Sequence, residues 1–330
     1  YTPGLGAGSM IAMSGHTDPY EVERLGLPSR QRRLADGLPI TLATPLTAST
    51  NAGAAIAILA PPPSPSLPPV AGSEKDPHLH FAHGGTADFR GRDGAYYNFF
   101  SAPGFSVNVK TEDATFRLHG GKLTVDGSFI TEVHVVARVG GAKRKWANAS
   151  CWAAEFNEFN TGWKLVNGTC GGAGGHSQYA FGLMGVKICE ELTIRVAYSH
   201  VTFSIPGWTV KARGNHVFDR IRGPAHRLDL SFIARGDAPA RSLPHGLIGQ
   251  SYSTPGMREG AVDAYPAHRR IATTAQAEGA IEGIAANYEV GWAHATHFAF
   301  SRFNGVEGVS ADLPTGGDGQ SASGASAVGR

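Results

Sequence analysis

The chain has 330 residues, of which 44 are glycine and 20 are proline, and its formal net charge is +2. This length is enough for one large or two small domains, and the glycine and proline content favours short strands and turns over long helices. Basic residues form only short clusters, at 30–33 and 143–145. These lack the interleaved aromatic residues of a nucleic-acid groove, so we expect no nucleic-acid partner.

Residues 1–75 are expected to form an extended N-terminal arm that ends in a proline-rich linker. No charged residue occurs from 37 to 73, Arg32 and Arg33 precede this stretch, and it contains the small-residue sequence Ala57-Ile58-Leu59-Ala60. This is the order of parts in a signal for export or for the thylakoid lumen. Residues 37–60 also fit a disordered linker or a membrane-inserted segment, and residues 61–69 predict a stiff polyproline-type spacer.

Residues 76–304 predict a mainly β domain, either an antiparallel β-sandwich or a long twisted sheet. Apolar residues recur at every second position in 105–110, 129–139, 192–198, 201–205 and 228–233. This is the period of strands with one buried face. Turn pairs such as Asp126-Gly127 and Pro206-Gly207 separate the runs. Strands with one apolar face bury it by stacking in layers, as in a sandwich.

Three later segments depart from this pattern. Residues 142–175 hold three tryptophans and a glycine run, and predict a large irregular excursion. Residues 273–288 predict one short C-terminal helix, since Thr273 and Gln276 fit a capping box and apolar residues follow at helical spacing. Residues 305–330 are rich in glycine and serine and predict an extended tail.

The three cysteines, Cys151, Cys170 and Cys189, lie 19 residues apart and allow one intrachain disulfide and one free thiol. A bond between Cys151 and Cys170 would staple the excursion. Asn148-Ala149-Ser150 and Asn167-Gly168-Thr169 are sequons, so Asn148 and Asn167 are candidate glycosylation sites. Together these features favour an extracellular or organelle-lumen location, with the thylakoid lumen as one version.

A histidine-rich segment opens the predicted domain and gives the candidate metal ligands. His78, His80 and His83 could hold zinc or copper, and the nearby Asp76, Asp88 and Asp93 could supply oxygen ligands to calcium. The alternative is that the histidines bond the backbone or stay exposed while the aspartates cap turns.

Two motifs carry a resemblance to a known family. Asp76-Pro77-His78-Leu79 with Asp88-Phe89-Arg90-Gly91, and Pro244-His245-Gly246-Leu247-Ile248-Gly249-Gln250, resemble segments of von Willebrand factor type D-like domains and of related root-cap-type and inter-alpha-inhibitor heavy-chain modules. The resemblance implies an extracellular or lumenal β module used in assembly, adhesion or matrix building, sometimes with bound calcium. The many cysteines of the animal domains are missing here, so their disulfide pattern is not carried over.

The second motif also has an interpretation of its own. Gly246 and Gly249 predict a tight buried turn, with His245 and Gln250 bonding nearby backbone groups. Pro77 is the matching structural residue of the first motif.

No Gly-x-Ser-x-Gly, P-loop or His-Glu-x-x-His motif occurs, so we expect no enzyme. The favoured function is a structural or interaction subunit of a larger extracellular or lumenal assembly with protein partners, in one version membrane-associated. Three alternatives stay open: a lumenal accessory subunit of a photosynthetic membrane complex such as a photosystem, a module binding calcium or zinc, and a hydrolase that uses His245.

Overall fold

The computed structural model describes residues 68–141, 145–157, 162–172 and 175–308. The predicted arm up to residue 67, with its leader and spacer segments, and the tail from residue 309 lie outside the described residues. Within them the chain is mainly β, with two large antiparallel sheets, which confirms the predicted fold class. None of the helices in the described ranges has the length and apolar content needed to cross a membrane.

One sheet has eight strands, and every neighbouring pair in it is antiparallel. Its spatial order is β10 (Val186–Cys189), β11 (Leu192–Val196), β12 (His200–Ile205), β13 (Trp208–His216), β15 (His226–Ala234), β1 (Val70–Glu74), β2 (His78–His80) and β3 (Thr86–Asp88). The domain therefore begins at least as early as Val70, because β1 is an inner strand of this sheet and lies before the expected boundary at 76.

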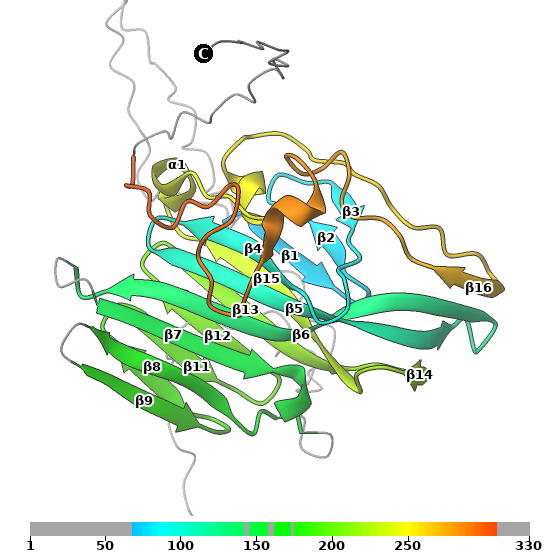
Figure 1. Ribbon diagram of the computed structural model, residues 1–330, viewed down its shortest axis with the longest axis horizontal. Coiled ribbons are helices and arrows are strands. Elements are labelled where there is room, and N and C mark those ends of the chain that lie inside the picture. Colours follow the sequence, from blue (N-terminus) through cyan, green and yellow to red (C-terminus); the bar gives the residue numbers. More distant parts are fainter. Residues whose placement is uncertain (1–67, 142–144, 158–161, 173–174, 309–330) are drawn as a thin grey trace, which may run out of the picture. The chain divides into compact units, whose positions relative to one another are not determined.

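The other sheet has nine strands and includes the two longest strands of the described residues. Its main path is β17 (Glu289–Val290), β4 (Tyr96–Ala102), β5 (Phe105–Leu118), β6 (Leu123–Val139), β7 (Lys145–Trp152), β8 (Val166–Gly172) and β9 (Gly175–Phe181). Off this path, β14 (Arg220–Arg222) pairs with β5, and β16 (Arg269–Ala272) pairs in parallel with β6. These two short strands flank the far ends of β5 and β6, which extend well to the right in Figure 1.

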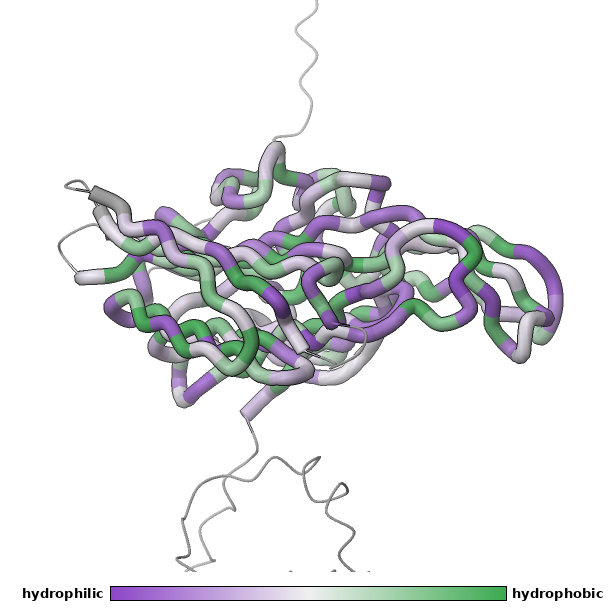
Figure 2. Tube along the Cα trace, turned by 90° about the horizontal axis from the view of Figure 1, so that it is seen from below, coloured by the Kyte–Doolittle hydropathy of each residue, from purple (hydrophilic) through white to green (hydrophobic). Residues whose placement is uncertain are grey.

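The core lies where the two sheets face each other. Phe100 of β4 packs against Trp208 of β13 at 4.5 Å and Phe232 of β15 at 5.7 Å between ring centroids, so its ring joins the two sheets. Polar and apolar residues alternate along the strands, as Figure 2 shows, so each strand gives one face to this core.

The segment around His245 fixes β4 in place. The backbone N–H and carbonyl of His245 each bond Ser101 at 2.7 Å, and Leu247 and Ile248 donate to the carbonyls of Asn98 and Phe99. Gly246 has φ +101°, so the predicted tight turn with positive φ is present there. Gly249 is different: it begins the 3₁₀ helix Gly249–Tyr252 and is not among the positive-φ glycines.

Two sequence predictions are wrong. The segment 142–175 is not an irregular excursion, because it contains β7 and β8. The only α-helix in the described ranges is α1 (Ala238–Ser242), whereas 273–288 holds only the 3₁₀ helix Ala285–Tyr288. Positive φ angles at Ala277, Gly279 and Gly283 interrupt that segment, and an α-helix cannot accommodate them. One further 3₁₀ helix spans Ala153–Glu155.

Candidate functional site

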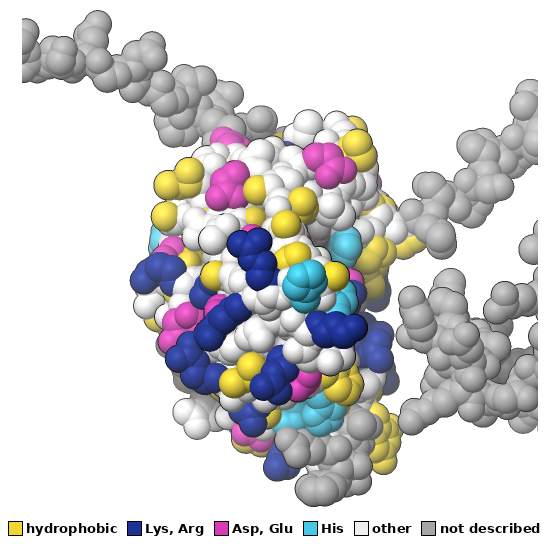
Figure 3. Space-filling view, turned by 90° about the vertical axis from the view of Figure 1, so that its right-hand side faces the viewer, with side chains coloured by type: hydrophobic (Ala, Val, Ile, Leu, Met, Phe, Trp, Pro, Cys, Tyr) yellow, Lys and Arg dark blue, Asp and Glu magenta, His cyan; other side chains and the backbone are white. Residues whose placement is uncertain are grey.

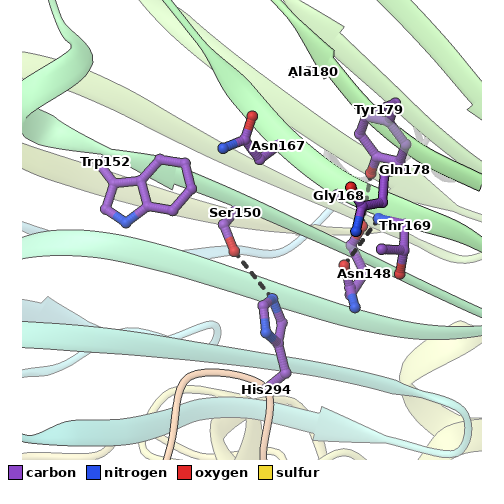
Figure 4. A pocket seen from close by; sticks show the side chains of 10 residues that line it. All are labelled: Asn148, Ser150, Trp152, Asn167, Gly168, Thr169, Gln178, Tyr179, Ala180 and His294. Atoms are coloured by element: carbon purple, nitrogen blue, oxygen red, sulfur yellow. Dashed lines mark hydrogen bonds between the residues drawn. The ribbon is translucent and has the colours of Figure 1, made fainter.

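The outer face of the nine-stranded sheet carries an open hollow of about 520 Å³ over β7, β8 and β9. This volume falls within the ~300–1,000 Å³ typical of small-molecule sites. Figure 4 shows the side chains around it, with Trp152 on one side and His294 reaching in from the C-terminal segment. The lining residues are Asn148, Ser150, Trp152, Asn167, Gly168, Thr169, Gln178, Tyr179, Ala180 and His294.

Side chains of β7 point alternately into the core and to the outer face that carries the hollow. Ala147, Ala149 and Cys151 are buried in the core, so the intervening Asn148, Ser150 and Trp152 face outward. The inward side chains are small and the outward ones are polar or aromatic. This period-two pattern was the signal that could have identified both the strand and the site.

The two sequons lie opposite each other in the sheet. β7 and β8 are antiparallel, with Asn148 opposite Thr169 and Ser150 opposite Asn167. The Thr169 backbone N–H donates to Asn148 Oδ1 over 3.0 Å. Both candidate glycosylation sites are therefore half-buried members of one hollow, and their modification stays a prediction.

Gly168 leaves room for the side chain of Tyr179, which lies opposite it in the sheet. A Cβ atom at position 168 would lie 2.1 Å from the Tyr179 hydroxyl and 2.2 Å from the Asn148 carbonyl oxygen. The Tyr179 hydroxyl uses that space to donate to the same carbonyl over 2.7 Å. The Asn148 backbone and side chain are thus both held by neighbouring strands.

A chain of hydrogen bonds runs from the hollow into the sheet surface. His294 Nε2 lies 3.0 Å from Ser150 Oγ, which lies 2.7 Å from Nδ1 of His134. Nε2 of His134 lies 2.9 Å from Glu132 Oε2. The Glu132 carboxylate favours the tautomer that carries its proton on Nε2, which leaves Nδ1 to accept from the Ser150 hydroxyl. Lys110 completes the chain with an ion pair to Glu132 at 2.9 Å.

The described lining of the hollow is electrically neutral. Among the described residues that line it, none is Asp, Glu, Lys or Arg. Burial, together with the neighbouring His134, lowers the pKa of His294 to about 4, so its imidazole is uncharged at neutral pH. Burial would raise the pKa of Glu132, but hydrogen bonds from His134 and Lys110 outweigh it and keep this carboxylate ionised beneath the site.

The side chains near Ser150 have part of the geometry used in acyl transfer. Ser150, His134 and Glu132 have the order of a nucleophile, a base and an acid. However, β7 is an inner strand between β6 and β8, so the backbone amides near Ser150 are used in the sheet. The described residues of β7 therefore offer no pair of free amides to an oxyanion above the hydroxyl, and such a pair is the usual requirement for this chemistry.

The predicted metal ligands lie in or next to β2 and β3 of the other sheet, and most of them are used in protein contacts. His78 Nδ1 lies 2.6 Å from Asp88 Oδ1, while Asp76 accepts from the Ser128 backbone N–H and the Tyr265 hydroxyl. His80 and His83 are exposed. Among the described residues, no group of three or more His, Cys, Asp or Glu is placed to hold a metal ion. Calcium or zinc binding therefore stays a prediction without a built site behind it.

The other predicted residues of these motifs also have structural contacts. Asp93 Oδ1 accepts from the Asp113 backbone N–H at 2.8 Å. The Pro77 carbonyl accepts from the Phe89 N–H at 2.8 Å. Gln250 accepts from the Glu282 backbone N–H and donates to the Tyr288 hydroxyl. Both motifs therefore connect segments that are distant in the chain.

His245 has an acidic neighbour in the structure. Its Nε2 lies 3.1 Å from Glu282 Oε2, its Nδ1 accepts from the Gly246 N–H, and its ring stacks on Tyr288 and Phe300. Burial lowers the pKa of His245 to about 4. Since both ring nitrogens are occupied, the geometry gives His245 a role in packing.

The cysteines pair differently from the pairing considered above. Cys170 of β8 is bonded to Cys189 of β10, and Cys151 is a buried free thiol. The disulfide thus joins a strand of each sheet. Cys151 points into the core from β7, and burial raises the pKa of its thiol.

Comparison with protein-family models gives no match to this chain. A comparison with curated proteins also gives no match.

Proposed function

We propose that the chain is a non-catalytic interaction module of an extracellular or lumenal assembly, and that the hollow on its nine-stranded sheet binds a neutral carbohydrate. The observation that carries this proposal is the composition of the described lining of the hollow: one tryptophan beside a row of amide and hydroxyl side chains, with no Asp, Glu, Lys or Arg among them. The Cys170–Cys189 disulfide and the two sequons support the compartment.

Each part of the lining matches one property of a sugar. The C–H face of a pyranose ring is apolar and packs on an aromatic ring, which Trp152 offers at the edge of the hollow. Sugar hydroxyls both donate and accept, and so do the amides of Asn148, Asn167 and Gln178. A charged ligand would find no ion-pair partner among these residues.

The resemblance to von Willebrand factor type D-like modules is part of the same proposal. Such modules build matrices and adhesive assemblies, and a carbohydrate-binding face would let this chain attach to a polysaccharide of such a matrix. In that setting the carbohydrate is the partner proposed for the hollow, and protein subunits would bind elsewhere on the surface.

The test is a screen of the full chain against neutral oligosaccharides, followed by calorimetry on any ligand found. Trp152→Ala and Asn167→Ala should each weaken binding about tenfold or more. Trp146→Ala is the matched control, because Trp146 faces outward on the same strand but does not line the hollow. Failure of every neutral glycan to bind, or equal effects of the Trp152 and Trp146 substitutions, would contradict the proposal.

The non-catalytic part has its own test. A fluorophosphonate that labels activated serines should leave the Ser150 hydroxyl unmodified, since the backbone amides of β7 near it are used in the sheet. Labelling that disappears in Ser150→Ala and in His134→Gln would show that the hydrogen-bonded chain activates the serine, and would replace binding by acyl transfer as the function.

A further inference from the structure

The outer ends of β5 and β6, with β14 and β16 on either side, form a separate cationic feature, which we call the basic tip. It comprises residues 115–126, 217–223 and 268–272. It contains only two carboxylates, Asp126 and Asp219. Its six cationic side chains are Arg117, Lys122, Arg220, Arg222, Arg269 and Arg270. The tip thus has an excess of four positive charges, whereas the whole chain has a net charge of only +2.

The sheet register places three of the arginines on one face. Arg270 is opposite Thr124, and Thr124 is opposite Arg117. One step along, Arg222 is opposite Thr115, which is opposite Asp126. Directly opposed residues share a face of a sheet, so Arg117, Arg222 and Arg270 are presented together. Figure 3 looks onto this side of the molecule, where Lys and Arg side chains gather with hydrophobic ones among them.

Only part of this charge is neutralised within the protein. Asp126 accepts two hydrogen bonds from Arg270, at 2.8 and 3.1 Å, and Asp219 lies 3.7 Å from Arg117. The described residues give no side-chain hydrogen bond or ion pair to Lys122, Arg222 or Arg269. The pKa of Asp126 is lowered, first by its hydrogen bonds from Arg270, with the charge of Arg222 contributing.

Two apolar side chains project from the same tip. Phe218 is 79% exposed and Ile221 is 50% exposed. Ile221 lies between Arg220 and Arg222, and Phe218 precedes Asp219, whose carbonyl accepts from the Arg117 N–H. The tip is not a loose loop, because Phe116, Leu123, Val125 and neighbouring residues form a small buried core of their own behind it.

We propose that the basic tip docks on an anionic lipid bilayer. Lipid headgroups supply negative charge to the unpaired cations, and the interfacial region gives Phe218 and Ile221 an apolar environment. A soluble polyanion would satisfy the arginines but would leave these two side chains in water. The rigid core behind the tip would allow docking without rearrangement of the sheet.

The test is co-sedimentation of the full chain with phosphatidylcholine vesicles, with and without phosphatidylglycerol. Lys122→Glu with Arg222→Glu takes the charge excess of the tip from four to zero, and should reduce binding to the anionic vesicles about tenfold or more. Phe218→Ser with Ile221→Ser should also weaken binding while leaving the charge unchanged. Binding to vesicles of phosphatidylcholine alone is the control that measures lipid binding by other parts of the chain.

Matched controls lie at the far edge of the eight-stranded sheet. Arg195→Glu on β11 and Ile188→Ser on β10 change an exposed cation and an exposed apolar residue outside the tip, and should leave vesicle binding unchanged. Circular dichroism should show the same fold in all variants. Equal effects of tip and control substitutions, no preference for anionic vesicles, or tip-dependent binding to a soluble sulfated polysaccharide without vesicle binding would each overturn the proposal.

Discussion

The backbone N–H of Thr169 donates to Asn148 Oδ1 over 3.0 Å, so the two sequons are hydrogen-bonded to each other across β7 and β8. Asn167, in contrast, has no side-chain hydrogen bond to any described residue. The two asparagines of the hollow therefore differ in what they are free to do: Asn148 holds the sheet surface together, and Asn167 is available to a ligand.

Substitution of each asparagine by alanine should separate these roles. Asn148→Ala leaves the Thr169 N–H without its acceptor and should lower the free energy of unfolding by ~1 kcal/mol. Asn167→Ala should leave stability unchanged and weaken only carbohydrate binding. Urea unfolding and calorimetry measure the two effects, and equal losses of stability would contradict this division.

Gly246→Ala should be strongly destabilising. Gly246 has φ +101°, and a Cβ atom there would lie 2.6 Å from Asn98 Oδ1 and 2.7 Å from the Phe100 backbone nitrogen. Backbone strain and this overlap with β4 together should cost ~3 kcal/mol or more. Gly236→Ala is the matched control, because Gly236 also has positive φ but a Cβ atom added there would meet nothing within 4 Å. It should lose only ~1 kcal/mol in the same unfolding experiment.

Asp76 gives the protein a specific pH dependence. Burial, only partly offset by hydrogen bonds from Ser128 and Tyr265, raises the pKa of Asp76 to about 6 from its ordinary 3.8. The folded state therefore holds the proton more tightly than the unfolded chain, so this stabilisation is complete below pH ~4 and is lost as pH rises through 6.

Asp76→Asn should remove this loss. The unfolding free energy of the variant minus that of the wild type should be ~3 kcal/mol larger at pH 7 than at pH 4. Urea unfolding of both proteins across this range is the measurement. A difference between them that stays constant with pH would show that Asp76 does not titrate in this range.

Loss of the Cys170–Cys189 bond should be costly, because it closes a loop with a sequence separation of 19 and joins the two sheets. The double variant Cys170→Ser with Cys189→Ser should lose ~3 kcal/mol of unfolding free energy. Cys151→Ala, which removes the buried thiol but no crosslink, is the control that identifies the bond as the cause. Reductant should destabilise the wild type and leave the double variant unchanged.

The strands that the sequence predicted best are those whose inward residues are large. In β6, Val133 and Val135 alternate with polar residues and are fully buried, and such a pattern has one interpretation. β7 escaped prediction because Ala147 and Ala149 are its inward residues, and alanine marks a buried face only weakly. The hollow was missed with it, since Ser150 and Trp152 are the outward residues of that strand.

The predicted helix failed for a different reason. Ala277, Ile281 and Tyr288 fall at helical spacing, but their side chains are buried from a looping backbone in which Gly279 and Gly283 have positive φ. Tertiary packing overrides local propensity there. Long-range pairs, such as Cys170 with Cys189 or His294 with Ser150, have no local pattern that reveals them.

The position of β1 in the eight-stranded sheet also determines the order in which the molecule can assemble. Val70 of β1 pairs with Ile233 of β15. The two strands can therefore pair only after the ribosome has made all the residues between them. Closing so long a loop is slow. Until β15 has been made, β1 can pair only with β2, and its other edge stays open to other chains.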